Sequence, residues 1–325
     1  MKTSNFFRIA LVAASLTFMF ACKKDNSSSS STPSTTNLQT SSDDQAMASN
    51  ENEAVSNDAT AALTVSPSIS GASINETGKP GGSVLGGGDS AGICDATIAF
   101  DTTSSTKTVT ITYNGTNCWG NRTRTGTVVI SVPKGVHWAD KGATVSISIE
   151  NLKITRVRDG KSIVINGTKT ITNKSGGLLI NLATLPSITY DLSDTLSIAF
   201  DNGSLRTWNA SKERVFTYSN GIVITTTGTH SDGTNSDIAE WGTNRFGVSY
   251  SSRITAPKVI EQSCDFRLVS GQNTITSGDK FTAVITYGLD ANGIPVTSCP
   301  TGNFYANVAW TYLPTGKTGS FLVQY

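Results

Sequence analysis

The sequence has little charge and almost no histidine. Charged residues make up 15% of the 325 residues, the formal net charge is +1, and the two histidines are His137 and His230. No basic stripe runs along the chain, so nucleic acid is not expected as a partner. Neither histidine lies in a recognisable catalytic motif and no Cys-x-x-Cys pair occurs. The sequence therefore predicts a protein that is not an enzyme and holds no metal and no cofactor.

Long hydrophobic runs are also scarce, and the one that stands out is at the N-terminus. Lys2 and Arg8 precede an apolar run over residues 9–21, which only Ser15 and Thr17 interrupt. As a helix this run would span about 20 Å, less than a bilayer core of roughly 30 Å. A positive start and a short apolar core predict a signal peptide over residues 1–21.

The run ends Phe18-Met19-Phe20-Ala21-Cys22, which resembles a bacterial lipobox. Ala21 is the small residue that such a site requires, whereas Met19 and Phe20 depart from its commonest pattern. The resemblance implies diacylglyceryl modification of Cys22, hence a membrane partner through a lipid anchor. Lys23-Lys24-Asp25 partly resembles a surface-export signal, so we expect an outer membrane lipoprotein on the cell surface rather than on the periplasmic face.

Residues 22–92 have few large apolar side chains and many Ser, Thr, Asn, Asp and Gly, including the runs at 27–31 and 86–88. Such a segment buries too little apolar surface to offset the entropy of ordering it. Beyond the lipidated Cys22, we therefore expect a disordered tether as far as residue 92. The weak apolar stretch at 61–65 is not expected to change this.

The remaining residues, 93–325, predict one all-β globular domain. Apolar and Thr or Ser residues alternate with period two in many short runs, which is typical of half-buried strands. Asn-Gly and Asp-Gly pairs between the runs favour tight hairpins. We expect an antiparallel meander that forms a sandwich, a curled sheet or an open barrel. The inward positions are predicted to include Val109, Ile111, Tyr113, Val145, Ile147, Ile149, Phe281, Ala283, Ile285, Tyr287, Phe304, Ala306, Val308, Trp310, Tyr312, Phe321, Val323 and Tyr325.

Four cysteines remain besides Cys22, and an even number in an exported protein indicates disulfides. Of three connectivities we favour Cys94–Cys118 and Cys264–Cys299, because each pair flanks its own strand pattern. Each segment reads cysteine, strand, Ile-Thr-Tyr, glycine turn, cysteine. This echo indicates either an internal duplication, 93–260 and 261–325, or chance likeness between Thr-rich strands.

Aromatic residues near turns are the candidate ligand contacts. An indole ring can take the C–H face of a sugar while neighbouring arginines bind its hydroxyls, although such residues also serve as core caps. The candidates are Trp119, Trp138, Trp208 and Trp241. Asp237, Glu240 and Asp265 are the carboxylates that a glycoside hydrolase could use, if they lay across a cleft.

Several segments together resemble a Bacteroidetes family of uncharacterised β-rich lipoproteins. They are the lipobox with Lys-Lys-Asp, the segment 111–118 ending at Cys118, the strand start at 124–126 and the run 166–172. The chain departs from that pattern at 296–300. The family has no established activity, so no catalytic residue carries over.

We expect a lipid-anchored envelope protein that acts as a non-enzymatic binding or structural module, with a glycan or another envelope protein as its partner. The first alternative is a carrier of an apolar ligand in a barrel-like cavity. The second is a glycan-active hydrolase.

Overall fold

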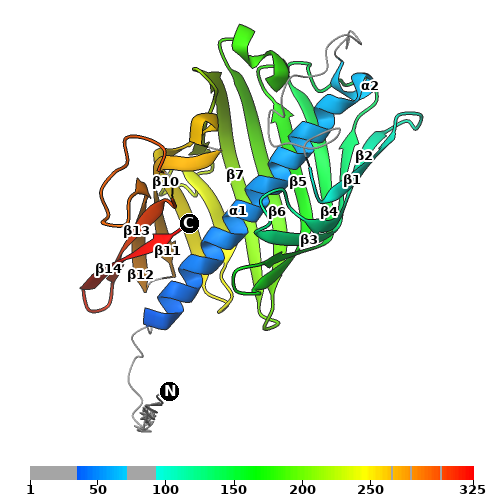
Figure 1. Ribbon diagram of the computed structural model, residues 1–325. Helices are drawn as coiled ribbons and strands as arrows, with labels where there is room; N and C mark the ends of the chain where they lie inside the picture. The colour runs from blue at the N-terminus through cyan, green and yellow to red at the C-terminus, as the bar shows by residue number, and fades with distance from the viewer. Residues whose placement is uncertain (1–34, 72–92, 265, 279, 301) are drawn as a thin grey trace, which may run out of the picture.

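The computed structural model describes residues 35–71, 93–264, 266–278, 280–300 and 302–325. It contains one long helix and one large antiparallel sheet (Figure 1). The helices are α1 (Thr35–Val65) and α2 (Pro67–Ser70), with two short 3-10 turns at Leu179–Thr184 and Gln262–Cys264. The signal peptide, the predicted lipobox with Cys22 and Lys23-Lys24-Asp25 all lie outside the described residues.

Fourteen strands form the sheet, which agrees with the predicted meander of many strands. Their bounds are β1 (Ala96–Asp101), β2 (Lys107–Thr116), β3 (Arg122–Val132), β4 (Ala143–Arg156), β5 (Ser162–Asn173), β6 (Ile188–Phe200), β7 (Leu205–Tyr218), β8 (Ile222–Gly228), β9 (Ile238–Thr243), β10 (Ser249–Glu261), β11 (Arg267–Ser277), β12 (Phe281–Leu289), β13 (Tyr305–Tyr312) and β14 (Lys317–Gln324).

The strands follow the chain order from β1 to β14 with one irregularity. Strands β8 and β9 lie end to end between β7 and β10, since each of them pairs with both of these longer strands. All pairings are antiparallel, so the predicted meander is confirmed, and it takes the form of one curled sheet. Figure 1 shows the sheet curling around α1, which crosses its concave side diagonally.

Local backbone features bend the central strands. Gly167 in β5 has a φ of 136°, and a Cβ there would lie 2.3 Å from the carbonyl oxygen of Thr195 on β6. Strand β4 carries a bulge opposite it, where Asn151 has a φ of 50° and its N–H is bonded to the side-chain oxygen of Asn166. Bulges and glycines of this kind raise the local twist and let a wide sheet curl.

The two predicted disulfides are confirmed. Cys94 bonds to Cys118 with the Cα atoms 5.2 Å apart, and Cys264 bonds to Cys299 with the Cα atoms 5.3 Å apart. The first encloses the hairpin β1–β2 and the second the hairpin β11–β12. Each therefore ties down one hairpin, and such loops stabilise a fold by constraining the unfolded chain.

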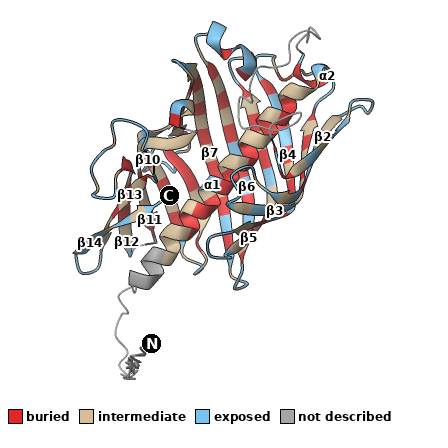
Figure 2. Cartoon of the chain, viewed as in Figure 1, coloured by how far each residue is buried: buried red, intermediate tan, exposed pale blue. Residues whose placement is uncertain are grey.

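The expectation of a disordered tether is wrong for residues 35–70. Helix α1 has 31 residues and lies against the concave face of the sheet, where Val55, Ala59 and Leu63 join the main core (Figure 2). Backbone bonds from Trp138 and Ala139 to the carbonyls of residues 69 and 70 fix the end of α2. Residues 22–34 and 72–92 of the predicted tether lie outside the described residues. Neither described helix has the length and apolarity needed to cross a bilayer.

The helix was missed because its buried positions repeat with a helical period but are largely polar. Buried residues recur every three or four positions along α1, from residue 44 to residue 63. Half of these positions are not hydrophobic: Asp44, Gln45, Glu51, Asn52, Ser56 and Thr60. A search for apolar periodicity cannot detect such a helix, because burial here depends on partners supplied by the sheet.

Candidate functional site

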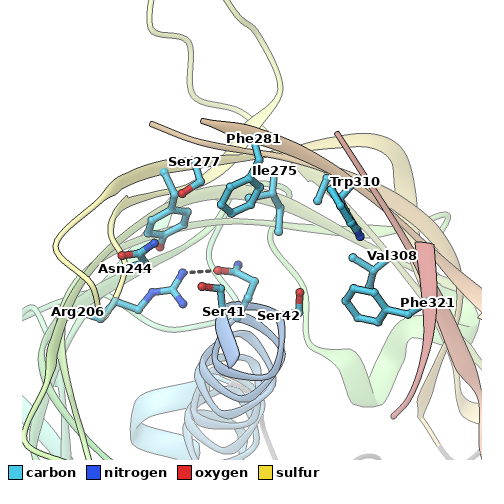
Figure 3. A pocket seen from close by; sticks show the side chains of 13 residues that line it. Ser41, Ser42, Arg206, Asn244, Ile275, Ser277, Phe281, Val308, Trp310 and Phe321 are labelled. Atoms are coloured by element: carbon cyan, nitrogen blue, oxygen red, sulfur yellow. Dashed lines mark hydrogen bonds between the residues drawn. The ribbon is translucent and has the colours of Figure 1, made fainter. Parts of the chain in front are cut away.

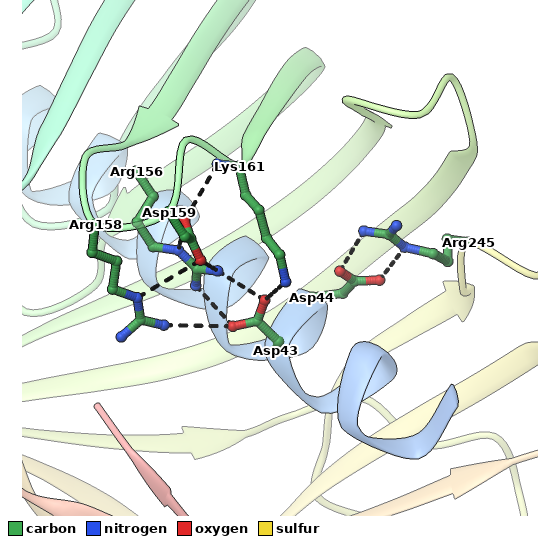
Figure 4. A network of polar contacts seen from close by, with 7 residues as sticks. All are labelled: Asp43, Asp44, Arg156, Arg158, Asp159, Lys161 and Arg245. Carbon is green, nitrogen blue, oxygen red and sulfur yellow. Dashed lines mark hydrogen bonds and ion pairs between the residues drawn. The ribbon is translucent and has the colours of Figure 1, made fainter. Parts of the chain in front are cut away.

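The concave face of the sheet is a trough lined with cations, and the acidic residues of α1 are buried in it. At the N-terminal part of the helix, Asp43 accepts two hydrogen bonds of 2.8 Å from Arg156 and one of 2.9 Å from Lys161 (Figure 4). Asp44 accepts two from Arg245, at 2.5 and 2.6 Å. Paired guanidinium–carboxylate bonds of this kind fix geometry as well as charge.

The middle of the helix meets a buried ion pair of the sheet. Lys169 on β5 and Asp194 on β6 are 2.7 Å apart, with side chains 0% and 3% exposed. Asn52 inserts its amide between them: its oxygen accepts from Lys169 and its nitrogen donates to Asp194, each at 2.5 Å. One helical residue therefore satisfies both ions, which is what makes a buried pair tolerable.

The next residue, Glu53, pairs with Lys212 at 3.0 Å and with Arg214, both on β7. Lys212 is also 2.6 Å from Glu240 on β9. Arg214 donates to Asn57 at 2.9 Å. Two helical positions and two strands thus share one charge network.

The third set of contacts lies towards the end of the helix, over β1–β3. Arg124 on β3 is 2.7 Å from Asp58 and 2.6 Å from Asp95. Tyr113 donates to Asp58 at 2.8 Å, and Arg122 pairs with Glu51. The helix is therefore held along its length by charged side chains that the sheet supplies between β3 and β10.

Burial and pairing compete in setting the pKa values of these carboxyls. Burial dominates at Asp44, Glu51 and Asp58 and raises the pKa of each. Burial also raises the pKa of Asp43, but its hydrogen bonds and charge interactions with Arg156 and Lys161 prevail and lower it to about 2. The pKa of Glu240 is lowered in the same way, chiefly by the charge of Lys212.

Arg206 on β7 differs from the other arginines of the trough. Its side chain is 3% exposed and its guanidinium stacks over Trp208 and Tyr250, with the central carbon 4.8 and 4.3 Å from the ring centroids. Among the described residues, no carboxylate lies within 4.0 Å of it, and its Nε has no hydrogen-bond partner. Its bond to the helix goes to the amide oxygen of Gln45, a neutral group.

Arg206 lines a pocket between the start of α1 and the last strands (Figure 3). One wall is apolar and belongs to β11–β14; we call this set the C-terminal apolar face: Ile275, Phe281, Ala283, Val308, Trp310 and Phe321. The polar end holds Ser41, Gln45 and Ser277 besides Arg206 (Figure 3). The enclosed space measures about 40 Å³, which is smaller than the usual ligand pocket, and it opens to solvent on one side.

The C-terminal apolar face belongs to a cluster separate from the main core. Ala283, Ile285, Ala306 and Val308 are buried at its centre, while Ile275, Trp310 and Phe321 are only partly covered. The alternation in the sequence predicts the inward direction of these residues correctly. What it does not reveal is that the described part of α1 fills the trough beside them and leaves this face incompletely covered (Figure 2).

The four predicted tryptophan contacts are not brought together. Trp138 and Trp208 are 0% exposed and belong to the core, so their assignment as ligand contacts is wrong. Their indoles pack against buried tyrosines, at centroid distances of 5.1 Å to Tyr190 and 6.3 Å to Tyr250.

Trp119 is 64% exposed in the turn after β2, far along the sheet from Trp241 on β9. One face of Trp241 is stacked on His230 at 4.0 Å, and both residues line an open pocket of about 370 Å³. The tryptophan that lines the pocket beside Arg206 is Trp310, which the sequence argument placed only among strand residues.

The candidate carboxylates do not form a hydrolase pair. Glu240 is 0% exposed and is bonded to Lys212, Gln45 and Ser49, whereas Asp237 is 56% exposed and 3.8 Å from Arg253. Asp265 lies outside the described residues. Among the described residues, no cluster of three or more His, Cys, Asp and Glu side chains has the geometry of a metal site.

No family model matches this chain, and no similar curated protein or solved structure is found. The resemblance to Bacteroidetes lipoproteins therefore stays a prediction from the sequence. The features that bear on function are the part of the concave face that α1 fills and the C-terminal apolar face beside it.

Proposed function

We propose that this protein is a lipid-anchored, non-enzymatic binding module of the cell envelope, and that the C-terminal apolar face holds an apolar chain. The observation that carries the proposal is the second apolar cluster, which borders an open pocket instead of joining the main core. Apolar surface that a protein leaves uncovered beside a few polar groups is the usual composition of a ligand site. This favours the apolar-ligand alternative over a glycan site.

The proposed address rests on the sequence around Cys22 and is supported by the two disulfides, which suit an oxidising compartment. Metabolic labelling with an alkyne fatty acid should modify the wild-type chain and not a Cys22→Ala variant. Protease treatment of intact cells, with a periplasmic marker as control, then tests the surface location. Cleavage only after the outer membrane is opened would assign the protein to the periplasmic side.

The binding proposal can be tested with the mature chain, residues 22–325 carrying Cys22→Ala, which avoids detergent. Dodecanoate and dodecanol are titrated separately by calorimetry, below the concentrations at which they aggregate. We expect at least one of them to bind at a single site.

Two neighbouring residues of β14 provide a matched pair of variants. Phe321 lines the pocket, whereas Leu322 points to the other face and is 40% exposed. Phe321→Asn should weaken binding about tenfold or more, because a buried phenylalanine contributes roughly 1.5–3 kcal/mol. Leu322→Asn should leave binding unchanged. Failure of both probes to bind, or equal effects of the two variants, would overturn the proposal.

A further inference from the structure

We infer that the pocket selects an anionic amphiphile, a long-chain monocarboxylate whose head is bound by Arg206. This deepens the proposed function, because it rests on the C-terminal apolar face holding the aliphatic chain. The inference names the chemical class of the ligand and the residue that recognises it.

The charge balance in the trough sets Arg206 apart from the other arginines that contact α1. Every arginine that α1 contacts has a carboxylate within 4.0 Å among the described residues, except Arg206. Asp44 and Glu240 act on the charge of Arg206 from beyond 4.0 Å. Its buried guanidinium nevertheless has no direct carboxylate partner among the described residues, and buried cations are normally paired. The helix places Gln45 opposite Arg206, so the chain supplies an amide where a carboxylate would neutralise the charge.

The amide of Gln45 is also fixed on its other side, because its nitrogen donates to Glu240 at 2.5 Å. Glu240 in turn is paired with Lys212. Glu240, the carboxylate that Gln45 contacts, is therefore already neutralised by another cation. The Nε of Arg206 keeps its donor capacity for a group that enters from the pocket.

A second feature is the polar lining beside Arg206. The Nε of Arg206 and the Oγ of Ser277 both lack a hydrogen-bond partner in the described part of the chain, and both residues are 3% exposed. Both residues line the pocket, together with Ser41 at the first turns of the helix (Figure 3). Unsatisfied buried donors on one side of a space are what a bound oxyanion would satisfy.

A third feature is the arrangement of polar and apolar groups. Figure 3 shows Arg206 at one end of the space and Trp310, Val308 and Phe321 at the other, with Ile275 between them. A ligand that fits both ends has a charged head and an aliphatic tail. A single available cation matches a monoanion, hence a carboxylate rather than a phosphate dianion.

The test compares ligands that share the same twelve-carbon chain: dodecanoate, dodecanol, dodecyl phosphate and dodecyltrimethylammonium. The wild-type mature chain should bind dodecanoate about tenfold to a hundredfold more tightly than dodecanol, the value of a charge-assisted hydrogen bond. The cationic amphiphile should bind most weakly. Because this comparison uses the unmodified pocket, it does not depend on a variant that folds.

Three variants locate the selectivity. Arg206→Gln should abolish the preference for dodecanoate over dodecanol, and Arg206→Lys should retain part of it. Lys161→Gln is the control, since Lys161 is a cation near the same end of the helix that lies outside the pocket. Circular dichroism establishes whether each variant is folded.

The outcomes separate this inference from the proposed function. If dodecanol binds as tightly as dodecanoate, the apolar face is a binding site and the assignment of Arg206 is overturned. If dodecyl phosphate binds more tightly than dodecanoate, the head is a phosphate and the monocarboxylate is overturned. If no probe binds, the proposed function fails as well.

Discussion

The two parts of the concave face are covered in opposite ways. Over β2–β9 the trough is filled by a polar helix, and its charges are matched one by one with carboxylates and amides of α1. Over β11–β14 the same face is apolar and stays partly uncovered. The difference shows that this sheet uses its own chain to satisfy charge, which is expensive to bury unpaired, while the described part of the chain leaves the apolar part of the face incompletely covered.

The largest effect on stability is expected at the buried ion pair under the middle of the helix. Asp194→Ala leaves Lys169 buried without a counterion, so it should lower the free energy of unfolding by about 3–5 kcal/mol. Urea unfolding followed by circular dichroism measures the loss. The double variant Asp194→Leu with Lys169→Met should cost less than the single one. A single variant that loses under about 1 kcal/mol would mean that Asn52 alone satisfies the lysine.

The disulfides allow the two ends of the sheet to be weakened separately. Replacing Cys94 and Cys118 by alanine should cost about 3 kcal/mol, and replacing Cys264 and Cys299 about 4 kcal/mol, since the closed loops span 24 and 35 residues. Only the second pair lies beside the C-terminal apolar face. Its loss should also weaken amphiphile binding, whereas loss of the first pair should not. Equal effects on binding would show that the two ends are not independent.

A smaller effect is expected from a single helical carboxylate. Glu53→Gln removes the carboxylate partner of Arg214 while leaving Lys212 its bond to Glu240, so we expect a loss of about 2 kcal/mol. Asn50 is the matched control, because it is the exposed residue in the middle of the same helix. Asn50→Ala should stay within about 0.5 kcal/mol of the wild type. Thermal unfolding of the three proteins decides, and equal stabilities would contradict the docking of α1 by charge.

The smallest effect should appear at alkaline pH, at the border between the two parts. Burial lowers the pKa of Lys258 to about 8, although Glu240 acts in the opposite direction; its ammonium lies 5.2 Å from the ring centroid of Tyr287. Between pH 8 and about 10 the unfolded chain holds this proton and the folded protein does not. Stability contributed by the neutral lysine should therefore rise with pH in that window, by about 1 kcal/mol.

Lys258→Met should flatten this rise when unfolding is measured between pH 7.5 and 9.5. The window ends there because Tyr250 and Tyr325, whose pKa values are raised to about 12, favour unfolding once unfolded tyrosines ionise near pH 10. An unchanged pH profile in the variant would show that Lys258 is not the group responsible.

Much of the fold could be predicted from local patterns. The alternation places Val109, Ile147 and Val308 on the inner face, where they are buried, and the flanking cysteines indicate both disulfides. These predictions succeed because strand faces and hairpin closures depend on neighbours in the sequence. The prediction for residues 35–70 failed because Asp44 and Asn52 are buried only in the presence of arginines and lysines more than 100 positions away.

The candidate site shows the same division. Trp138 and Trp208 read as ligand contacts because they lie near turns, yet both are in the core. Trp310 was assigned correctly to a strand face. Whether α1 covers that face depends on where the helix begins, and the periodicity of the sequence does not show this.

The sequence alone determined the all-β meander, the inward face of each strand and the pairing of four cysteines, because these follow from the two-residue repeat of strands and from short loops. The tertiary structure alone decided that a polar segment becomes a buried helix and that, among the described residues, no carboxylate lies within 4.0 Å of Arg206. The physical reason is that the free energy of burying a charge depends on its partners, and those partners come together only when the sheet curls.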